Sequence, residues 1–420
     1  MFPAFTKLKM DLLTIITALI ITSAAFSYFN QRFLRLPGTI GVMFISIVVS
    51  LFIILIGKTG TDNSGLIKTL AYNIDFSKVL LDVMLGFLLF AMAMHFNYHD
   101  LKKLRLPVIL LSTIGVIVSA GVFGGLFHLA TILLKIDIPL IYSFVFGALI
   151  SPTDPIAVAS VLKASKIPAR LETIISGESM FNDAVGLILF VTLLGISDQS
   201  QEGFSWMATL VLFSKEVIGG IIIGLIAGYT GYRLIKSISD FQTIFLISVA
   251  LVLGISVVAG RFHASVPLSA VTAGLIIGNN SFGKSHPAEQ SLSKVWQLLD
   301  DVLNTILFVM IGLQLILLPF LNNYLLIGCI SIGIVLIARM ISISIPAIFI
   351  LRRLNPNNLA ILTWAGLRGG ISVAMALLLP DSPYREAILS CCYFIVIFSV
   401  IVQGLTLNSV VNRFANDEDQ

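Results

Sequence analysis

The sequence carries little charge for its length. Charged residues make up 11% of its 420 residues, against roughly a quarter in soluble domains, while 57% are hydrophobic. The mean hydropathy of +1.00 excludes a water-soluble fold. Apolar runs of about 20 residues, the length that crosses a bilayer, recur from Leu12 to Val411. We therefore expect a multi-pass protein embedded in the lipid bilayer along nearly its whole length.

Cysteine is also scarce, and its positions argue against two kinds of structure. Cys329, Cys391 and Cys392 lie inside apolar segments, without paired spacing and without histidine neighbours. Such positions indicate neither a disulfide framework nor a metal site, and we expect no cofactor. The net charge of +4 would suggest a nucleic-acid partner in a soluble protein, but here the basic residues fall in short loops between apolar runs. We expect no nucleic-acid partner.

Polar clusters and clusters with glycine or proline divide the chain into about thirteen apolar spans. We predict an all-α polytopic membrane protein with spans beginning near residues 11, 38, 77, 106, 138, 170, 206, 240, 264, 296, 322, 357 and 387. If the spans alternate across the membrane, one side collects 15 of the 26 basic residues and the other side 9. The richer side is predicted to be cytoplasmic, which places the N-terminus outside and the C-terminus inside. The predicted organisation is one transmembrane domain (1–412) and a short cytoplasmic tail (413–420).

Two of these spans are interrupted by residues that break helices. The fifth contains Ser-Pro-Thr-Asp-Pro at 151–155, and the twelfth contains Gly-Leu-Arg-Gly-Gly at 366–370. The breaks lie about half a chain length apart, as expected if two inverted repeats each contribute one discontinuous helix to a site at the membrane midplane. Unwound backbone is tolerated at membrane depth only where it faces protein or a water-filled cavity. We therefore expect two crossed discontinuous helices beside a cavity.

Ionisable side chains within the spans are few, and such residues are expensive to bury and usually functional. The five that cannot be moved to an interface are Asp154, Glu178, Asp183, Arg339 and Arg368. Their charges sum to −1. Glu178 could pair with Arg339 or with Arg368, and we favour Arg339, which leaves Asp183 as the uncompensated carboxylate. Arg368 then either joins the pair or neutralises the carbonyl dipoles at its own break.

The sixth span carries four polar side chains with helical spacing. Ser179 and Asp183 lie four residues apart on one stripe, and Glu178 and Asn182 lie on the adjacent stripe. With the carbonyl of Thr153 and the carboxyl group next to it, these groups offer the all-oxygen shell that a hard cation requires. The alternative is that Thr153, Ser179 and Asn182 only form hydrogen bonds between helices.

A single buried carboxylate has a predictable stoichiometry. Burial disfavours the charged form of a carboxyl group, so Asp183 could hold either a proton or a cation. Because Asn182 is not ionisable, one carboxylate would exchange one proton for one Na⁺. We therefore predict electroneutral 1:1 exchange, whereas a second titrating acid would make the exchange electrogenic.

Taken together, these motifs resemble those of the NhaP-type sodium/proton antiporters. The likeness covers nearly the whole chain and is carried by Thr153-Asp154-Pro155, Gly177-Glu178-Ser179, Asn182-Asp183 and Gly366-Leu367-Arg368-Gly369. The resemblance implies a thirteen-helix homodimer. It also implies roles for single residues: Asp183 binds the exchanged ion, with Asp154, Ser179 and the Thr153 main chain in its shell; Glu178, Asn182 and Arg339 form a supporting polar cluster; and Arg368 lies at the helix crossing. Some relatives carry a glutamate in the third helix, where this chain reads Leu88–His95 without one.

The predicted function is that of a secondary active transporter, which exchanges Na⁺ or Li⁺ for H⁺ across the cell (inner) membrane in pH homeostasis. Exchange of K⁺ on the same site is the alternative. A channel fits less well, because one titratable carboxylate suits proton competition better than multi-site conduction. An intramembrane protease is a remote alternative, since no histidine shares the sixth span with Ser179.

Overall fold

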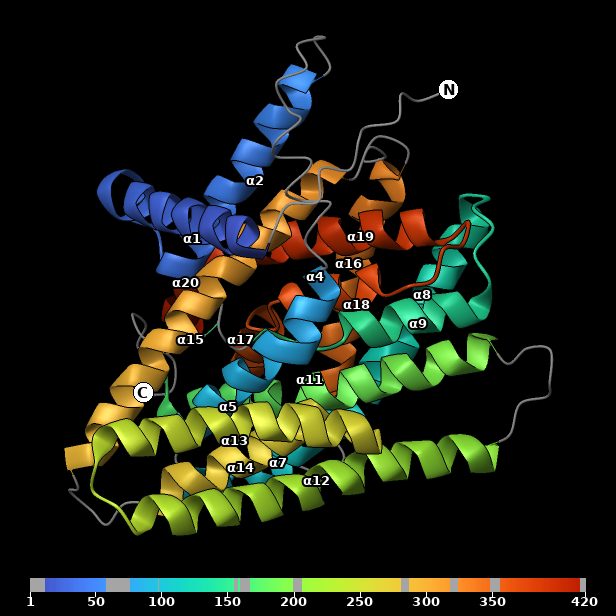
Figure 1. Cartoon of the computed structure of the whole chain (residues 1–420). Coiled ribbons are helices and arrows are strands. Elements are labelled where there is room, and N and C mark those ends of the chain that lie inside the picture. The colour runs from blue at the N-terminus through green and yellow to red at the C-terminus, as the bar shows by residue number, and fades with distance from the viewer. Residues whose placement is uncertain are drawn as a thin grey trace.

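The computed structural model describes residues 12–57, 76–96, 98–154, 158, 167–198, 206–280, 287–317, 324–347 and 356–415. Within these ranges the regular elements are all helical, as the composition predicted (Figure 1). All but one of the predicted spans begin within about three residues of an observed helix start. The exception is the tenth span, which was expected near residue 296 and begins at Pro287.

The described elements follow one another along the chain as a series of helices. The first half contains α1 (Leu12–Phe29), α2 (Gly38–Gly57), α4 (Phe76–Lys78), α5 (Leu85–His95), α6 (Tyr98–Lys103), α7 (Arg105–Leu110), α8 (Val116–Leu133), α9 (Leu140–Ile150) and α11 (Ala169–Asp198). The second half contains α12 (Trp206–Lys236), α13 (Phe241–Phe262), α14 (Val266–Asn280), α15 (Pro287–Gln314), α16 (Leu325–Pro346), α17 (Pro356–Trp364), α18 (Gly370–Leu377), α19 (Arg385–Phe398) and α20 (Gly404–Ala415). The π-helical turns are Asn30–Leu34, Val79–Met84, Leu111–Gly115 and Ser399–Gln403, and a 3₁₀ turn spans Leu315–Leu317.

The described helices have the length and composition of membrane spans. Nine of them are long and apolar enough to cross a bilayer, and three shorter apolar helices accompany them. Large apolar side chains on α1, α12 and α13 are exposed, as expected of surfaces that face lipid. The number of thirteen spans and the inverted-repeat relation of the two halves stay predictions.

The two expected helix breaks meet. The helix α9 ends at Ile150 and residues 151–154 are irregular, while residues 155–157 and 159–166, where the first span would continue, lie outside the described residues. In the second span, α17 ends at Trp364 and α18 begins at Gly370. The main-chain N–H of Asp154 donates a hydrogen bond to the carbonyl of Leu367, with 2.7 Å between nitrogen and oxygen. The irregular segment after α9 therefore contacts the break between α17 and α18, and this hydrogen bond satisfies one backbone group of each.

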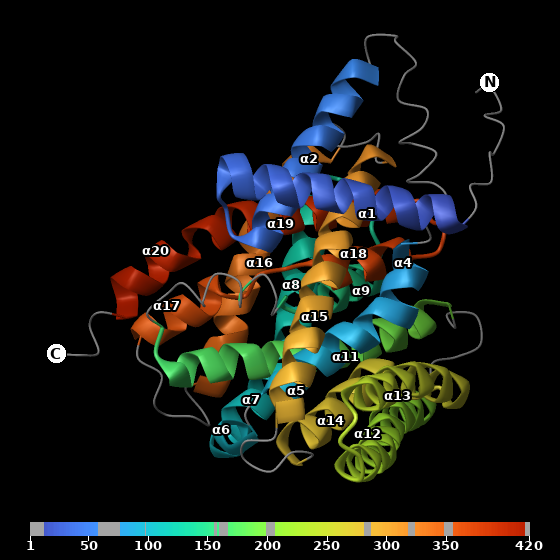
Figure 2. The same ribbon diagram turned by 60° about the vertical axis from the view of Figure 1, so that its left-hand side comes forward.

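Small residues bring three helices into close contact at one end of the molecule (Figure 2). Gly220 and Gly224 of α12 face α14, and Ser269 donates its hydroxyl to the Gly220 carbonyl at 2.9 Å. On the other side of α14, a methyl group on Gly274 would lie 2.7 Å from the carbonyl oxygen of Phe90 in α5. In lipid, where helix association depends on close packing, such residues fix the neighbours. The order α5, α14, α12 follows from them.

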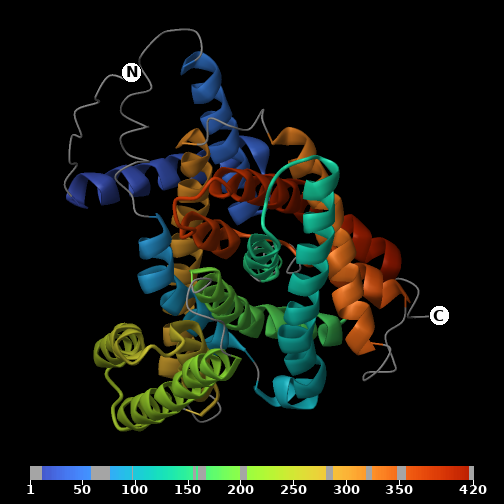
Figure 3. The same ribbon diagram turned by 90° about the vertical axis from the view of Figure 1, so that its right-hand side faces the viewer.

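Buried apolar side chains form two separate clusters. One contains α5, α12 to α14 and the first part of α15, including Trp296. The other contains α2, α8, α9, α16 to α19 and the second part of α15, including Leu307. Three of the described helices contribute to both clusters: α15, α11 through Ile175 and Met180, and α5 through Leu88 and Leu89. Figure 3 shows the yellow-green helices of the first cluster apart from the teal, orange and red helices of the second.

Candidate functional site

A small cavity lies where the broken helices cross, at the boundary between the two apolar clusters. Its volume is about 20 Å³, enough for roughly one water molecule or one bare monovalent cation. The polar part of its lining comes from Thr153, Asp154, Asp183 and Ser372, and α5 supplies most of the apolar part. Asp154 is 8% exposed and Asp183 is 2% exposed. Two carboxyl groups thus share one nearly enclosed space.

The sixth span is the helix α11, and its polar stripe faces inward as predicted. The side chains of Glu178, Ser179, Asn182 and Asp183 are each at most 2% exposed. Within the described residues, Asp183 forms no ion pair, and its Oδ2 has no hydrogen-bond partner. The Oδ1 of Asn182 is also without such a partner. A buried carboxylate oxygen without a partner can receive a proton or a cation, and a buried amide oxygen can contact a cation.

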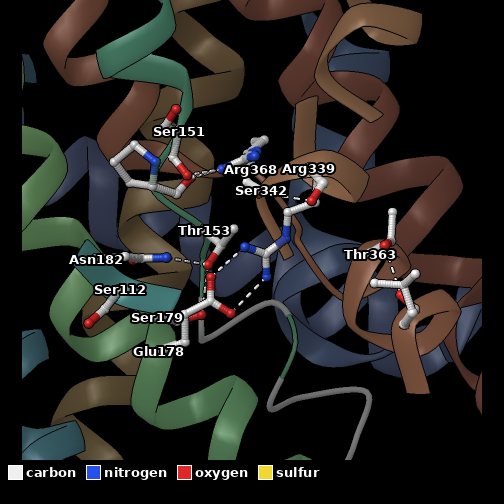
Figure 4. Close-up of polar contacts among 12 residues, drawn as sticks. Ser112, Ser151, Thr153, Glu178, Ser179, Asn182, Arg339, Ser342, Thr363 and Arg368 are labelled. Carbon is white, nitrogen blue, oxygen red and sulfur yellow. Dashed lines mark hydrogen bonds and ion pairs between the residues drawn. The ribbon is translucent and has the colours of Figure 1, made fainter. Parts of the chain in front are cut away.

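The hydroxyl of Thr153 joins the first break to α11 (Figure 4). Its Oγ1 lies 2.8 Å from the Ser179 Oγ, and it accepts a hydrogen bond of 2.6 Å from the Asn182 Nδ2. The Thr153 side chain, and not only the expected carbonyl, is therefore engaged with the stripe. Ser179 does not line the cavity itself but contacts Thr153, which does. The amide nitrogen of Asn182 donates to Thr153, whereas the resemblance placed Asn182 in a cluster with Glu178 and Arg339.

The predicted ion pair between Glu178 and Arg339 is present. The Arg339 Nη2 donates to Glu178 Oε2 at 2.8 Å, and Nη1 donates to Oε1. Both side chains are nearly fully buried, and such a fork of two parallel hydrogen bonds is the strongest arrangement for this pair. The pair ties α11 to α16 and removes the Glu178 charge from the cavity.

Arg368 lies where the two breaks meet, as the resemblance implied, but its hydrogen bonds match neither of the two roles inferred from charge. Its Nη1 donates to the main-chain carbonyls of Pro152, at 2.8 Å, and of Ser151. These carbonyls follow the C-terminal end of α9, where the helix dipole concentrates negative charge. Arg368 therefore neutralises the break in the other discontinuous helix, neither its own break nor Glu178.

Two glycines let the second break approach these polar groups. A methyl group on Gly369 would lie 2.6 Å from the Asp154 Cγ, and one on Gly366 would lie 2.6 Å from the Arg339 Nε. Real Cβ atoms do not approach other atoms so closely. The Gly-Leu-Arg-Gly-Gly sequence is thus required for contact with both the acidic site and the ion pair.

The sequence did not point to three further polar residues of this region. Ser372 lines the cavity from the first turn of α18. Ser399 accepts a hydrogen bond of 2.8 Å from the Arg368 main-chain N–H and donates to the Gln403 Oε1 at 2.7 Å. Ser399 and Gln403 are polar residues four positions apart in an apolar span, and this spacing could have predicted that they face the protein interior together.

Comparisons with known proteins bear on the family of the chain. Residues 18–413 match the family model described as sodium/hydrogen exchanger, transmembrane. The chain is 40% identical to the Na⁺/H⁺ antiporter NhaP of Pseudomonas aeruginosa, over 96% of this chain and 97% of that protein. It is 31% identical to the Na⁺/H⁺ antiporter NhaH of Halobacillus aidingensis, over 80% and 83% of the two chains.

The fold is also similar to that of a solved structure. A sodium/proton antiporter from Methanocaldococcus jannaschii superposes with a TM-score of 0.78 at 17% identity, over 96% of this chain and 99% of that one. At this level of identity the match supports the fold alone. The identities to the two bacterial relatives and the family match extend over most of the chain. The chain therefore belongs to the transmembrane sodium/hydrogen exchanger family, whose members are transporters and not intramembrane enzymes.

Proposed function

We propose that this protein exchanges one Na⁺, or one Li⁺, for one H⁺ across the membrane, and that Asp183 carries the exchanged ion. The observation that supports this most directly is that Asp183 lies in the enclosed cavity with no ion pair among the described residues. Asp154 shares the cavity, and Thr153 and Ser179 complete the shell. The names of the two bacterial relatives favour Na⁺, and nothing in them favours K⁺.

The charges in the site support the stoichiometry of one to one. Three buried carboxylates and two buried guanidinium groups leave one negative charge, which one proton or one monovalent cation neutralises. Glu178 is paired with Arg339, and Arg368 is held on carbonyl oxygens. Asp183 is the group that can change its occupant without disturbing these contacts. Each half of the cycle then carries the same charge across the membrane.

The position of the cavity supports an alternating-access mechanism. It lies between two apolar clusters, and among the described helices α5, α11 and α15 contribute to both of them. A movement of one cluster against the other would open the cavity to each side in turn, as rocking of bundles does in other secondary transporters. We further propose a homodimer in the cell (inner) membrane, with the N-terminus outside, the C-terminal residues 413–420 in the cytoplasm, and no resident cofactor.

Exchange is tested in vesicles that contain the purified protein and a pH-sensitive dye. We expect an added Na⁺ gradient to move protons, and the movement to persist when the membrane potential is collapsed. Proton movement that requires the potential would exclude the 1:1 stoichiometry. Asp183→Asn should abolish exchange, while Asp381→Asn, at a side chain that is 95% exposed, should not change it. Retained exchange in Asp183→Asn would remove this residue from the proposed role.

Competition between the two ions for one carboxylate gives a second test. The rate is measured across pH at several Na⁺ concentrations. A higher Na⁺ concentration should displace the pH optimum toward lower pH, since more protons are then needed to compete with the cation. An optimum that stays fixed at all Na⁺ concentrations would contradict competition at a single site.

A further inference from the structure

One buried polar side chain near the cavity has no evident structural use. Asn304 of α15 is fully buried, and neither its amide nitrogen nor its amide oxygen has a hydrogen-bond partner among the described residues. An unsatisfied buried amide destabilises a fold, and an apolar residue of the same size would not. The presence of asparagine at this position therefore needs another explanation.

The position of Asn304 on its helix places it between the cavity and a pair of acids. Leu307, three residues later, lines the cavity, and its Cδ1 lies 3.0 Å from where a methyl group on Gly370 would be. Residues three and four apart share a helix face, so Asn304 lies on the face that looks toward the cavity. Asp300 lies one turn earlier, and Asp301 beside it is exposed. Along the helix axis, Asn304 is about 4.5 Å from Leu307 and about 6 Å from Asp300.

The helices around this face are the ones that enclose the site. Figure 2 shows α15 passing α5 and α18, and it packs against both. The helix α5 supplies most of the apolar lining of the cavity, and α18 begins at the second break. Between Asp300 and Leu307, this face of α15 carries Leu303 and Asn304. Of these two residues, Asn304 is the polar one.

We propose that Asn304 is the polar step through which Na⁺, with part of its water shell, passes between Asp300 and the cavity at Asp183. This inference depends on the proposed Na⁺/H⁺ exchange. The amide oxygen can contact the cation, and the amide N–H group can donate to a water molecule that accompanies it. Because the amide is neutral, it adds no second titrating group and leaves the charge balance of the site unchanged. Asn304 thus affects the rate at which Na⁺ reaches Asp183 and not the equilibrium affinity of the site for Na⁺.

Asn304→Leu separates this role from a structural one. Leucine keeps the volume and removes the polar step. We expect kcat/KM for Na⁺ in vesicles to fall roughly tenfold or more, the loss typical of one hydrogen bond to a charged species. The Na⁺ affinity at equilibrium, measured as the Na⁺-dependent rise in Tm of the purified protein, should stay within about twofold of the original. The Tm without Na⁺ should be equal or higher. Asn304→Ser, which keeps a small polar group, should restore most of the rate.

Thr305→Val is the matched control, since Thr305 is the next residue on α15 and its hydroxyl only binds the Asp301 carbonyl of its own helix. It should exchange at the original rate. A normal rate in Asn304→Leu, or a lower Tm with a normal rate per folded molecule, would overturn the inference. A parallel loss of rate and of equilibrium affinity would also overturn it, because Asn304 would then belong to the binding shell. Absence of Na⁺-driven proton movement in the unmodified protein would instead overturn the proposed function, and this inference with it.

Discussion

Arg368 in the second broken helix donates its Nη1 to the main-chain carbonyl of Ser151 in the first, across 217 positions of sequence. The same guanidinium nitrogen reaches the next carbonyl, that of Pro152. The positive charge therefore compensates the end of α9 inside the protein, where Arg368 is buried. The two breaks form one polar unit, and neither is complete without the other.

Removal of this guanidinium group should destabilise the protein. Arg368→Ala leaves two buried carbonyls without their charged donor, and we expect a loss of about 1.5–3 kcal/mol in stability. Arg368→Lys keeps the charge and should lose less. Thermal unfolding and the yield of monodisperse protein in detergent measure both variants. An alanine variant as stable as the original would show that these hydrogen bonds contribute nothing.

The ion pair of Glu178 and Arg339 should matter for folding more than for ion affinity. Glu178→Ala leaves a buried guanidinium group without its partner, and we expect a loss of about 3–5 kcal/mol. Asp381→Ala is the control, because it breaks the pair between Asp381 and Arg385 at the surface, which is worth about 1 kcal/mol or less. Folded yield and thermal unfolding are compared with the KM for Na⁺. Normal expression of Glu178→Ala with a loss of transport alone would mean that this pair acts in the transport cycle.

A methyl group at Gly369 should interfere with the site directly. The backbone of Gly369 is extended, with φ −137° and ψ −150°, so alanine is not strained there. Its Cβ would however meet the Asp154 carboxyl group. We expect Gly369→Ala to lose at least tenfold in exchange rate, about 1.4 kcal/mol in the barrier. Gly333→Ala on α16, where no atom lies within 4 Å of the new methyl group, should exchange normally. Equal rates in the two variants would contradict the close contact.

The start of α13 provides a pH-dependent contribution outside the membrane. Hydrogen bonds from the hydroxyl and main-chain N–H of Thr243 hold the pKa of Asp240 below its ordinary value. A carboxylate with a lowered pKa stabilises the folded state above its unfolded pKa, and this contribution is lost as pH falls through the lowered value. Asp240→Ala should therefore lower Tm slightly at pH 7, with a difference that narrows in acid, whereas Asp240→Asn should keep the helix cap. A difference in Tm that does not change with pH would argue against the charged cap.

Much of the fold follows from local features of the sequence. The breaks at residues 151 and 366 are visible because proline and glycine act on the backbone of their own segment. The inward stripe of α11 is visible because helical spacing groups Ser179 with Asp183. The start of α15 was misplaced because its first turns are polar, although Pro287 is suited to the first position of a helix. That helix begins before its apolar part does.

The partners across the site could not be predicted in the same way. Charge balance limited the partner of Glu178 to two buried cations, and the favoured one, Arg339, is the one that forms the pair. The contact of Thr153 with Asn182 and that of Arg368 with Pro152 depend on how two distant breaks cross. No local pattern encodes a crossing. Ser372 enters the cavity for the same reason.

The contact between Ser151 and Arg368 also determines when, during synthesis, this part of the fold can form. During synthesis the ribosome adds 217 positions between Ser151 and Arg368, which at roughly 5–20 residues per second takes roughly 10–40 s. Through that interval the first broken helix is already made, and the guanidinium group that will neutralise its end does not yet exist. The nascent first half must therefore keep these carbonyls hydrated or at the membrane surface, and the candidate site is completed only as the last helices insert.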